Sequence, residues 1–220
     1  VTWEDGGNRI CQINENATKG DLQVITDEQF RHPVGDWKGA GVAIPVFALR
    51  SKNGVGVGQF TDLKLLVDWA KKTGLKMVPI LPINDTVATH HWTDSYPYAA
   101  ISVFALHPMY ADLQAMGTLS AKLSEEIIFE QGKALNQKNT VDYSGVMKLK
   151  ARFFKLIFDE TKAEVLRSEE FNAFVEENKK WLLPYAVFSY FRDLFGTPNF
   201  FEWGKYKDVT FQQLEEIADP

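Results

Sequence analysis

The pattern of apolar and polar positions divides the chain into three kinds of segment. The first 38 residues are polar with scattered apolar side chains, and only residues 21–25 predict a short strand. Residues 40–49 and 77–81 are continuous apolar runs, and from residue 117 onward the apolar positions follow helical spacing. Continuous apolar runs rich in β-branched residues are typical of strands buried on both faces of a parallel sheet. The sequence therefore predicts two such strands, although Pro45 and Pro79 each remove a hydrogen-bond donor from them.

A helix is predicted between the two strands. Its apolar positions recur at steps of three and four residues, which gathers them on one face: Leu63, Leu66, Val67 and Ala70. Thr61 or Asp62 can cap the first turn, and Gly74 supplies the left-handed residue that ends the helix. Strand, helix and strand in this order form a βαβ unit, whose two strands run parallel with a right-handed crossover.

A block of helices is predicted after this unit. The spacing favours helices over residues 120–135, 146–166 and 168–181, a further helix that Pro184 opens and Gly196 closes, and a last helix into Ile217. Thr210 and Gln213 form a capping box at the start of the last helix. No strand longer than a few residues is predicted beyond Tyr110. So long a helical block after only two strands is typical of an insertion into an α/β fold.

Composition narrows the function classes. With 220 residues, of which 45% are hydrophobic, the chain can bury a core of its own. A formal net charge of -5 argues against nucleic-acid binding, which needs a basic face, and favours a neutral or small partner. The single cysteine, Cys11, cannot form an internal disulfide, and no apolar run reaches the roughly 18 residues of a membrane span. We therefore expect a cytoplasmic protein without membrane contact.

Three alternating glycines, Gly54, Gly56 and Gly58, precede the predicted helix and suggest a nucleotide-binding loop. The dinucleotide fingerprint, however, spaces its glycines as G-x-G-x-x-G, so the third glycine here comes one residue early. The second predicted strand also ends in Leu81 and Pro82, without the acidic residue that binds a ribose. We therefore interpret the segment as a glycine-bent loop and predict no cofactor.

The loop after the second strand is rich in residue types that bind sugars. Its candidate site residues lie close together in the sequence: Asp85, Trp92, Asp94, Ser95, Tyr96 and Tyr98. A carbohydrate offers hydroxyls to polar side chains and an apolar pyranose face to an aromatic ring, and this loop carries partners for both. His90 and His91 also lie here, but adjacent side chains seldom point the same way and no third ligand follows. The sequence therefore predicts a carbohydrate site and no metal site.

The end of this loop carries a family resemblance. Residues 94–98, DSYPY, followed by residues 101–110, ISVFALHPMY, resemble the signature of the 4-α-glucanotransferases, the amylomaltase or disproportionating-enzyme family. Three upstream segments also resemble that family in order and spacing, namely residues 54–60, 66–70 and 81–86. The resemblance therefore covers residues 39–110. At the start of the chain, WEDGGNR over residues 3–9 resembles the closing strand of a starch-binding β-sandwich module. The resemblance is therefore to the branch in which such a module precedes the enzyme domain.

The resemblance implies a fold and a division of the chain. The apolar runs would be the first strands of a (β/α)8 TIM barrel, so the implied fold class is α/β with an α-helical insertion. Four parts are then expected: residues 1–15 as the tail of the starch-binding module, 16–38 as a linker, 39–116 as the first β/α units with the sugar-binding loop, and 117–220 as a helical insertion subdomain.

The resemblance also implies a reaction. The family transfers maltosyl or longer segments between α-1,4-glucans (maltose, maltodextrin, starch or glycogen) by a retaining double displacement, which needs two carboxyl groups beside the scissile bond. The carboxylates on the loop, Asp85 and Asp94, look like such a pair. In the family, however, the nucleophile, the acid/base and a stabilising carboxylate lie on later strands, in motifs absent from this sequence. We therefore expect this chain to be the front part of the enzyme. It would supply one wall of the active site without catalytic residues, and it would need the remaining part of the same enzyme for activity.

Roles for single residues follow from the resemblance by position. Tyr98 matches the tyrosine that lies along the sugar beside the scissile bond, and either Ser95 or Tyr96 matches its small polar neighbour. Trp92 is either a sugar platform or a lid over the core, and Asp94 either binds glucose or caps the loop.

One further expectation concerns Asp85, and another concerns the function of the chain. Asp85 is expected to bind a sugar hydroxyl. The alternative to an enzyme is an α-glucan-binding module without catalysis, because the aromatic loop alone would suffice for binding.

Overall fold

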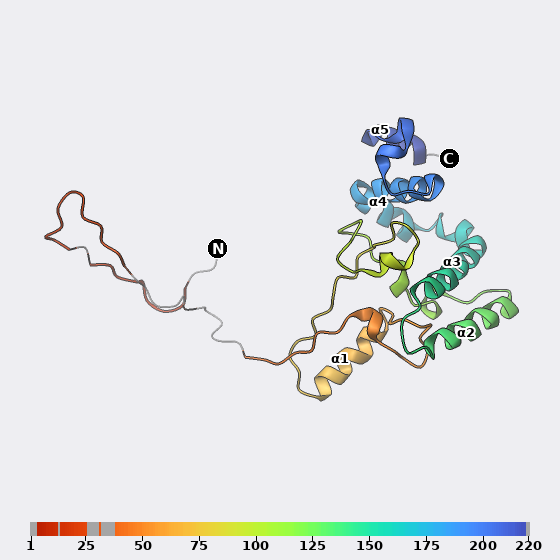
Figure 1. Cartoon of the computed structure of the whole chain (residues 1–220), viewed down its shortest axis with the longest axis horizontal. Helices are drawn as coiled ribbons and strands as arrows, with labels where there is room; N and C mark the ends of the chain where they lie inside the picture. The colour runs from red at the N-terminus through yellow and green to blue at the C-terminus, as the bar shows by residue number, and fades with distance from the viewer. Residues whose placement is uncertain (1–3, 13, 26–30, 32–37, 219–220) are drawn as a thin grey trace. The chain divides into compact units, whose positions relative to one another are not determined.

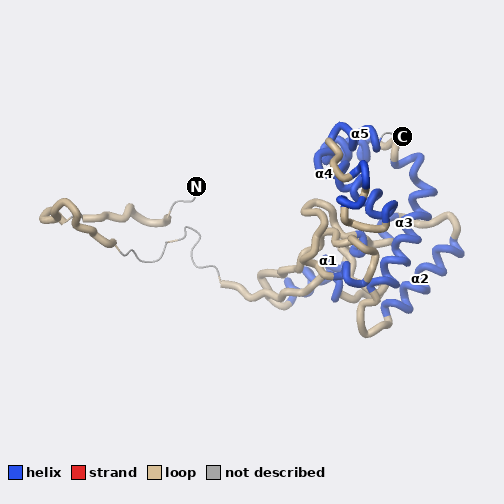
Figure 2. Tube along the Cα trace, turned by 45° about the horizontal axis from the view of Figure 1, so that its top comes forward, coloured by secondary structure: helices blue, strands red, loops and turns tan. Residues whose placement is uncertain are grey.

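Helices dominate the part of the chain that the structure describes. The structure, a computed structural model, describes residues 4–12, 14–25, 31 and 38–218, and it divides the chain into two units, Val1–Ala40 and Gly41–Pro220. The second unit holds the α-helices (Figure 1): α1 Asp62–Lys72, α2 Lys122–Asn136, α3 Tyr143–Val165, α4 Glu169–Phe195 and α5 Phe211–Ala218. The other described residues form loops and short 3-10 helices, without a strand (Figure 2). None of these helices combines the length and the apolar character needed to cross a membrane.

The prediction of strands at residues 40–49 and 77–81 is wrong, because the structure has no strand in either segment. The two segments do meet in parallel orientation, but the pairing amounts to one bridge between Gly41 and Met77. The approach there is close, because a Cβ on Gly41 would lie 2.6 Å from the carbonyl oxygen of Met77. The predicted order of strand, helix and strand therefore survives as a parallel contact on either side of α1, without a sheet among the described residues.

Proline explains why this pairing does not extend. The last backbone hydrogen bond in the pairing of the two segments runs from Ile44 N to Pro79 O, 3.1 Å apart. Pro45 and Pro79 carry no N–H and cannot donate to a neighbouring strand. Immediately after Pro45 the chain turns into the 3-10 helix Val46–Ala48. The part that the structure describes is therefore mostly helical, and the α/β class with its TIM barrel stays a prediction.

Helix α1 forms where the sequence predicts it. The carboxylate of Asp62 accepts a backbone N–H of the preceding turn at 2.8 Å, and Gly74 follows the helix in the predicted left-handed conformation, with φ +76°. Leu66 and Ala70 are buried beneath the helix, whereas Val67, predicted on the same face, is 54% exposed. The apolar face of α1 is therefore narrower than its sequence pattern indicates.

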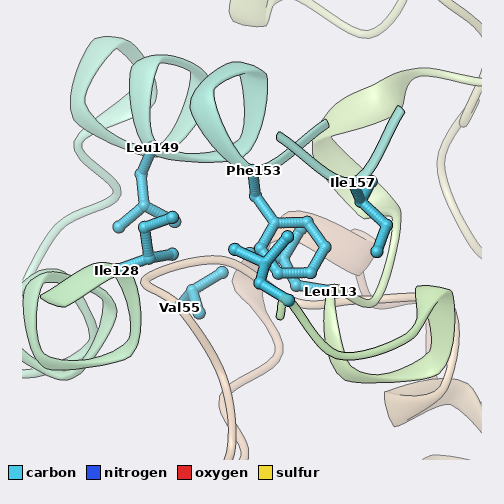
Figure 3. Packing of buried hydrophobic residues seen from close by; sticks show 7 residues of the cluster. Val55, Leu113, Ile128, Leu149, Phe153 and Ile157 are labelled. Carbon is cyan, nitrogen blue, oxygen red and sulfur yellow. The ribbon is translucent and has the colours of Figure 1, made fainter. Parts of the chain in front are cut away.

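One hydrophobic core joins the loops before residue 116 to helices α2 and α3. Its buried residues come from both sides (Figure 3): Val55, Leu113, Leu119, Ile128, Leu149, Phe153 and Ile157. Phe153 of α3 is fully buried and points toward Leu113 in Figure 3. The core thus crosses the predicted domain boundary at residue 116, and the four-part division of the chain stays a prediction.

Helix α4 corrects the prediction of two helices separated at Pro184. It begins after Ser168, whose hydroxyl caps its first turn, runs unbroken through Pro184, and ends as predicted at Gly196. An internal proline costs a helix about 3 kcal/mol, because it lacks an N–H and its ring meets the preceding turn. Packing offsets this cost, since α4 contributes to a separate buried apolar cluster: Val187, Phe191 and Trp203.

The remaining helices follow their local signals. Helices α2 and α3 overlap the segments predicted at 120–135 and 146–166. The capping box predicted for α5 is confirmed, because Thr210 N donates to Gln213 Oε1 at 2.8 Å and Gln213 N donates to Thr210 Oγ1 at 3.3 Å.

The first unit has no buried side chain among its described residues. Glu4 connects two of its segments, since its carboxylate pairs with Arg9 and accepts the backbone N–H of Arg31 at 2.6 Å. These bonds, that to Arg9 above all, lower the pKa of Glu4 to about 2. Residues 21–25, predicted as a strand, are irregular. Trp3, on which the resemblance to a starch-binding module depends, lies outside the described residues.

Candidate functional site

A closed loop, here termed the aromatic loop, runs from Asn84 to Leu106, where an antiparallel bridge joins its ends. Two further backbone bonds hold its base: Asp85 N donates to Ala105 O at 2.9 Å, and Ile101 N donates to Asp85 O at 2.8 Å. Closing the ends removes much of the conformational freedom that a loop of this length would otherwise have. The side chains on the loop are therefore presented from a defined frame.

Asp94 holds the inside of the loop together. It is 5% exposed, and its carboxylate accepts the N–H of Ala88 at 3.2 Å and both the N–H and the hydroxyl of Thr89, at 2.9 and 3.0 Å. Its carbonyl oxygen also accepts the hydroxyl of Thr86. Of the two roles expected for Asp94, the structure displays the loop-capping one, and glucose binding by this residue stays a prediction.

The outer side of the loop presents aromatic rings to solvent. Trp92, Tyr96 and Tyr98 are 62%, 60% and 60% exposed, and the two tyrosine rings lie 5.5 Å apart, tilted by 53°, on either side of Pro97. Ser95 is exposed beside them. All the candidate residues from 92 to 98 thus lie on the loop surface except Asp94, and the choice between Ser95 and Tyr96 as the polar neighbour stays open.

Trp92 and Ser95 also line a cavity. The cavity has a volume of about 480 Å³ and is closed on the other side by the start of α3, at Asp142 and Tyr143. Trp92 therefore stands at the edge of a hollow, so its role as a platform rather than as a lid stays a prediction.

Asp85 is buried at the base of the loop, with 2% of its surface exposed. One carboxylate oxygen accepts the N–H of Val87 at 2.9 Å, and the other accepts the hydroxyl of Tyr185, on α4, at 2.6 Å. Burial and the bond to Asp85 raise the pKa of Tyr185 well above its ordinary value, so Tyr185 stays protonated and donates. The hydroxyl-binding role expected of Asp85 stays a prediction, since both of its oxygens already have partners in this structure.

The two adjacent histidines point to different partners. His90 Nε2 lies 2.7 Å from Asp193 Oδ1 on α4, whereas the ring of His91 lies 5.8 Å from that of Trp92. Across the part of the chain that the structure describes, no three His, Cys, Asp or Glu side chains gather in an arrangement that could hold a metal ion.

His107, which the sequence did not single out, is buried under the loop with 3% of its surface exposed. Its Nδ1 accepts the N–H of Met109 at 3.0 Å, and its Nε2 lies 3.3 Å from the hydroxyl of Tyr143. Burial lowers the pKa of His107 to about 4, although the nearby carboxylates Asp85 and Asp94 oppose the shift. The ring is therefore neutral at pH 7, with its proton on Nε2.

Lys150 of α3 is a second buried residue that the sequence did not reveal. It has no exposed surface, and its ammonium donates to the carbonyl oxygens of Met109 and Ala111, the latter at 2.6 Å. Burial lowers the pKa of Lys150 to about 7, against the attraction of Asp112 and Asp62. A signal was present in the sequence, because a lysine at position 150 falls on the apolar stripe of the predicted helix.

Comparison with known proteins bears on the family. Residues 44–219 match the family described as 4-alpha-glucanotransferase. The chain is 40% identical over 217 residues to the 4-alpha-glucanotransferase DPE2 of Oryza sativa subsp. japonica, a match that covers 98% of this chain and 22% of the rice protein. It is 31% identical over 178 residues to the 4-alpha-glucanotransferase of Chlamydia muridarum, covering 80% of this chain and 33% of that protein.

A third relative is the 4-alpha-glucanotransferase of Clostridium butyricum, 30% identical over 174 residues, which cover 74% of this chain and 31% of that protein. The chain thus spans between 22% and 33% of the length of these relatives. The family match includes the aromatic loop, α1 and all the later helices, and it confirms the resemblance on the loop motif. The chain belongs to the 4-alpha-glucanotransferase family.

Proposed function

We propose that this chain supplies one wall of the active site of a 4-α-glucanotransferase that acts on α-1,4-glucans such as maltose, maltodextrin, starch or glycogen by retaining double displacement. The observation that carries the proposal is the exposed pair Tyr96 and Tyr98 on a loop whose base is closed by hydrogen bonds. A tyrosine ring offers an apolar face to a pyranose and a hydroxyl to its polar edge. A closed loop loses little further freedom on binding, so more of the contact energy remains as affinity.

In this proposal Tyr98 lies along the glucan, with Ser95 or Tyr96 as its polar neighbour and Trp92 as a further platform. The catalytic carboxylates come from outside these 220 residues. Burial of Asp85 and Asp94 supports this division, because every carboxylate oxygen of the two residues already accepts a hydrogen bond within the chain. A nucleophile and an acid must instead face the scissile bond.

The proposal is tested by Tyr98→Ala in the full-length gene product. Transfer between maltodextrins is expected to fall by about tenfold or more, the scale of losing one well-placed contact in the transition state. Tyr190→Ala is the matched control, since Tyr190 on α4 is equally exposed, at 59% against 60%. Equal transfer rates in the wild type and in Tyr98→Ala would remove Tyr98 from the site.

A second candidate, an α-glucan-binding module without catalysis, is favoured by the same engagement of Asp85 and Asp94. The two candidates differ in the behaviour of the 220-residue chain itself. A binding module predicts heat on titration with maltodextrin in calorimetry, whereas one wall of a larger site predicts none until the remaining wall is present. For either candidate we propose a cytoplasmic location, supported by the single cysteine, Cys11, which is free.

A further inference from the structure

We propose that helix α4 sets the conformation of the aromatic loop, with Tyr185 and Arg192 as positioning residues for substrate binding. The inference rests on the proposed function, because it concerns the loop that would hold the glucan. In Figure 1 the loop, in yellow-green, lies directly below α4. The contacts between the two connect residues far apart in the sequence, and Asp85 and Tyr185, for example, are 100 positions apart.

One face of α4 provides the contacts. Trp181, Tyr185 and Arg192 are spaced by four and seven residues, which places them above one another along a helix. Each meets a different part of the loop. Tyr185 reaches the base, Arg192 reaches the segment that leaves the base, and Trp181 reaches the segment that returns to it.

The bond between Tyr185 and Asp85 is the central one. Its length of 2.6 Å and its charged acceptor are typical of a strong hydrogen bond. The backbone of Asp85 pairs at the same time with both Ile101 and Ala105, so the residue joins the two ends of the loop. The hydroxyl of Tyr185 therefore connects the joined ends of the loop to α4.

Arg192 holds the next segment of the loop. It is 6% exposed, and its Nη1 donates to the carbonyl oxygen of Val87, while its Nε donates to Asp193 at 2.8 Å. Burial tends to raise the pKa of Asp193, but the bonds from Arg192 and His90 outweigh it and leave the pKa below the ordinary value. Asp193 is thus an ionised bridge between Arg192 and His90, whose φ of +57° places it in the left-handed region.

The returning segment is held by ring stacking. Phe104 lies over Trp181 with ring centroids 5.5 Å apart and an angle of 21° between the planes. The helix is itself fixed on another side, where Val187 and Phe191 are buried with Trp203. Helix α4 is therefore packed on one side and attached to the loop at four points, Asp85, Val87, His90 and Phe104.

The space on the α3 side of the loop is hollow. A cavity of about 410 Å³ lies there, lined on the loop side by Asp85 and Val87, on α4 by Tyr185 and Arg192, and on α3 by Met147. Side chains of α3 therefore do not fill the space behind the base of the loop. Beside this cavity the base of the loop is held by the polar contacts from α4, which is why we expect a measurable effect from the removal of one hydroxyl.

The test is Tyr185→Phe in the full-length gene product, with Tyr190→Phe as the matched control. Tyr190 lies on the same helix and is 59% exposed, so the control removes a hydroxyl from an exposed residue of the same type. Hydrogen exchange of residues 84–106 and the kinetics of maltodextrin transfer are measured on both variants. Tyr185→Phe is expected to speed exchange in the loop and to raise KM by about tenfold, the scale of losing one hydrogen bond to a charged group, with kcat nearly unchanged. Tyr190→Phe is expected to change neither.

Unchanged exchange in Tyr185→Phe would overturn the inference, and so would faster exchange with an unchanged KM, because the position of the loop would then not matter for binding. A general loss of stability is distinguished by exchange in helices α2 and α3, which should stay as in the wild type. If the wild type transfers no α-1,4-glucan, the proposed function fails, and the exchange data alone decide whether α4 holds the loop. Arg192→Met, which keeps the aliphatic part of the side chain but removes its donors, should then speed exchange around Val87, and the absence of that change counts against the inference.

Discussion

Lys150→Met is the substitution that tests the buried network beneath the aromatic loop. Met has nearly the length of Lys and no charge, so the change removes the ammonium while it keeps most of the volume. In the wild type this ammonium has no exposed surface and donates to two backbone carbonyls just after the loop, those of Met109 and Ala111. The substitution therefore exchanges the cost of a buried charge for the cost of two unpaired carbonyls.

The magnitude follows from the pKa. Burial lowers the pKa of Lys150 from 10.5 to about 7. Each unit corresponds to about 1.4 kcal/mol, so the charged form is disfavoured in the folded state by about 5 kcal/mol relative to the unfolded chain. An unpaired buried carbonyl costs about 1–3 kcal/mol, so the two effects nearly cancel at pH 7. Stability at a single pH therefore does not report on the charge.

The pH dependence does report on it. Between pH 7 and 10.5 the unfolded chain holds the proton of Lys150 and the folded chain has largely released it, so the unfolded state binds more protons. The free energy of unfolding then rises with pH, by about 2 kcal/mol between pH 7 and pH 9 from this residue. In Lys150→Met this contribution disappears.

The assay is urea unfolding at pH 7, 8 and 9, followed by tryptophan fluorescence, on the wild type, Lys150→Met and Lys148→Met. Lys148 is an exposed lysine of the same helix, so its variant should keep the wild-type pH dependence. Parallel profiles of Lys150→Met and the wild type would show that the ammonium does not titrate in this range, and the reasoning from burial would be wrong.

Two further predictions concern stability. The pKa of His107 is lowered from 6.5 to about 4, so the unfolded chain takes up the proton first as the pH falls. The free energy of unfolding of the wild type should therefore fall by about 3 kcal/mol between pH 6.5 and 4, as measured by urea unfolding at these two pH values. In His107→Gln the same measurement should give a distinctly smaller fall. A steeper loss in the variant would contradict the assignment. Phe153→Ala empties the centre of the core and should cost about 3–5 kcal/mol, whereas Phe158→Ala, at a side chain that is 53% exposed, should cost under about 1 kcal/mol by the same measurement. Similar costs for the two would mean that the core does not depend on Phe153.

Much of the helical structure was predictable because its signals are local. Gly74 and Gly196 end their helices as expected, and Thr210 with Gln213 forms the capping box that starts α5. A cap involves residues three or four positions apart, so the neighbours that decide it are present in the sequence itself.

Prolines mark where sequence reasoning was wrong, in two opposite ways. Pro45 and Pro79 prevent the extended strand pairing that the apolar runs predicted. Pro184 was expected to begin a new helix, but it lies inside the continuous helix α4. The burial that the apolar pattern predicts is found at Val46, which is 1% exposed, but not in the second run, where Met77 and Ile80 are 48% and 37% exposed. Whether a segment with a proline pairs, turns or stays helical depended on the packing around it.

The sequence by itself determined which residue types lie on the loop between residues 84 and 106, where most helices end, and to which family the chain is similar. Tertiary structure alone decided that Asp85 is bound by Tyr185, and that Lys150 and His107 lose their usual pKa values by burial. The physical reason is range. Helix caps and side-chain chemistry depend on near neighbours in the chain, whereas burial and the partner of a buried polar group depend on segments that only folding brings together.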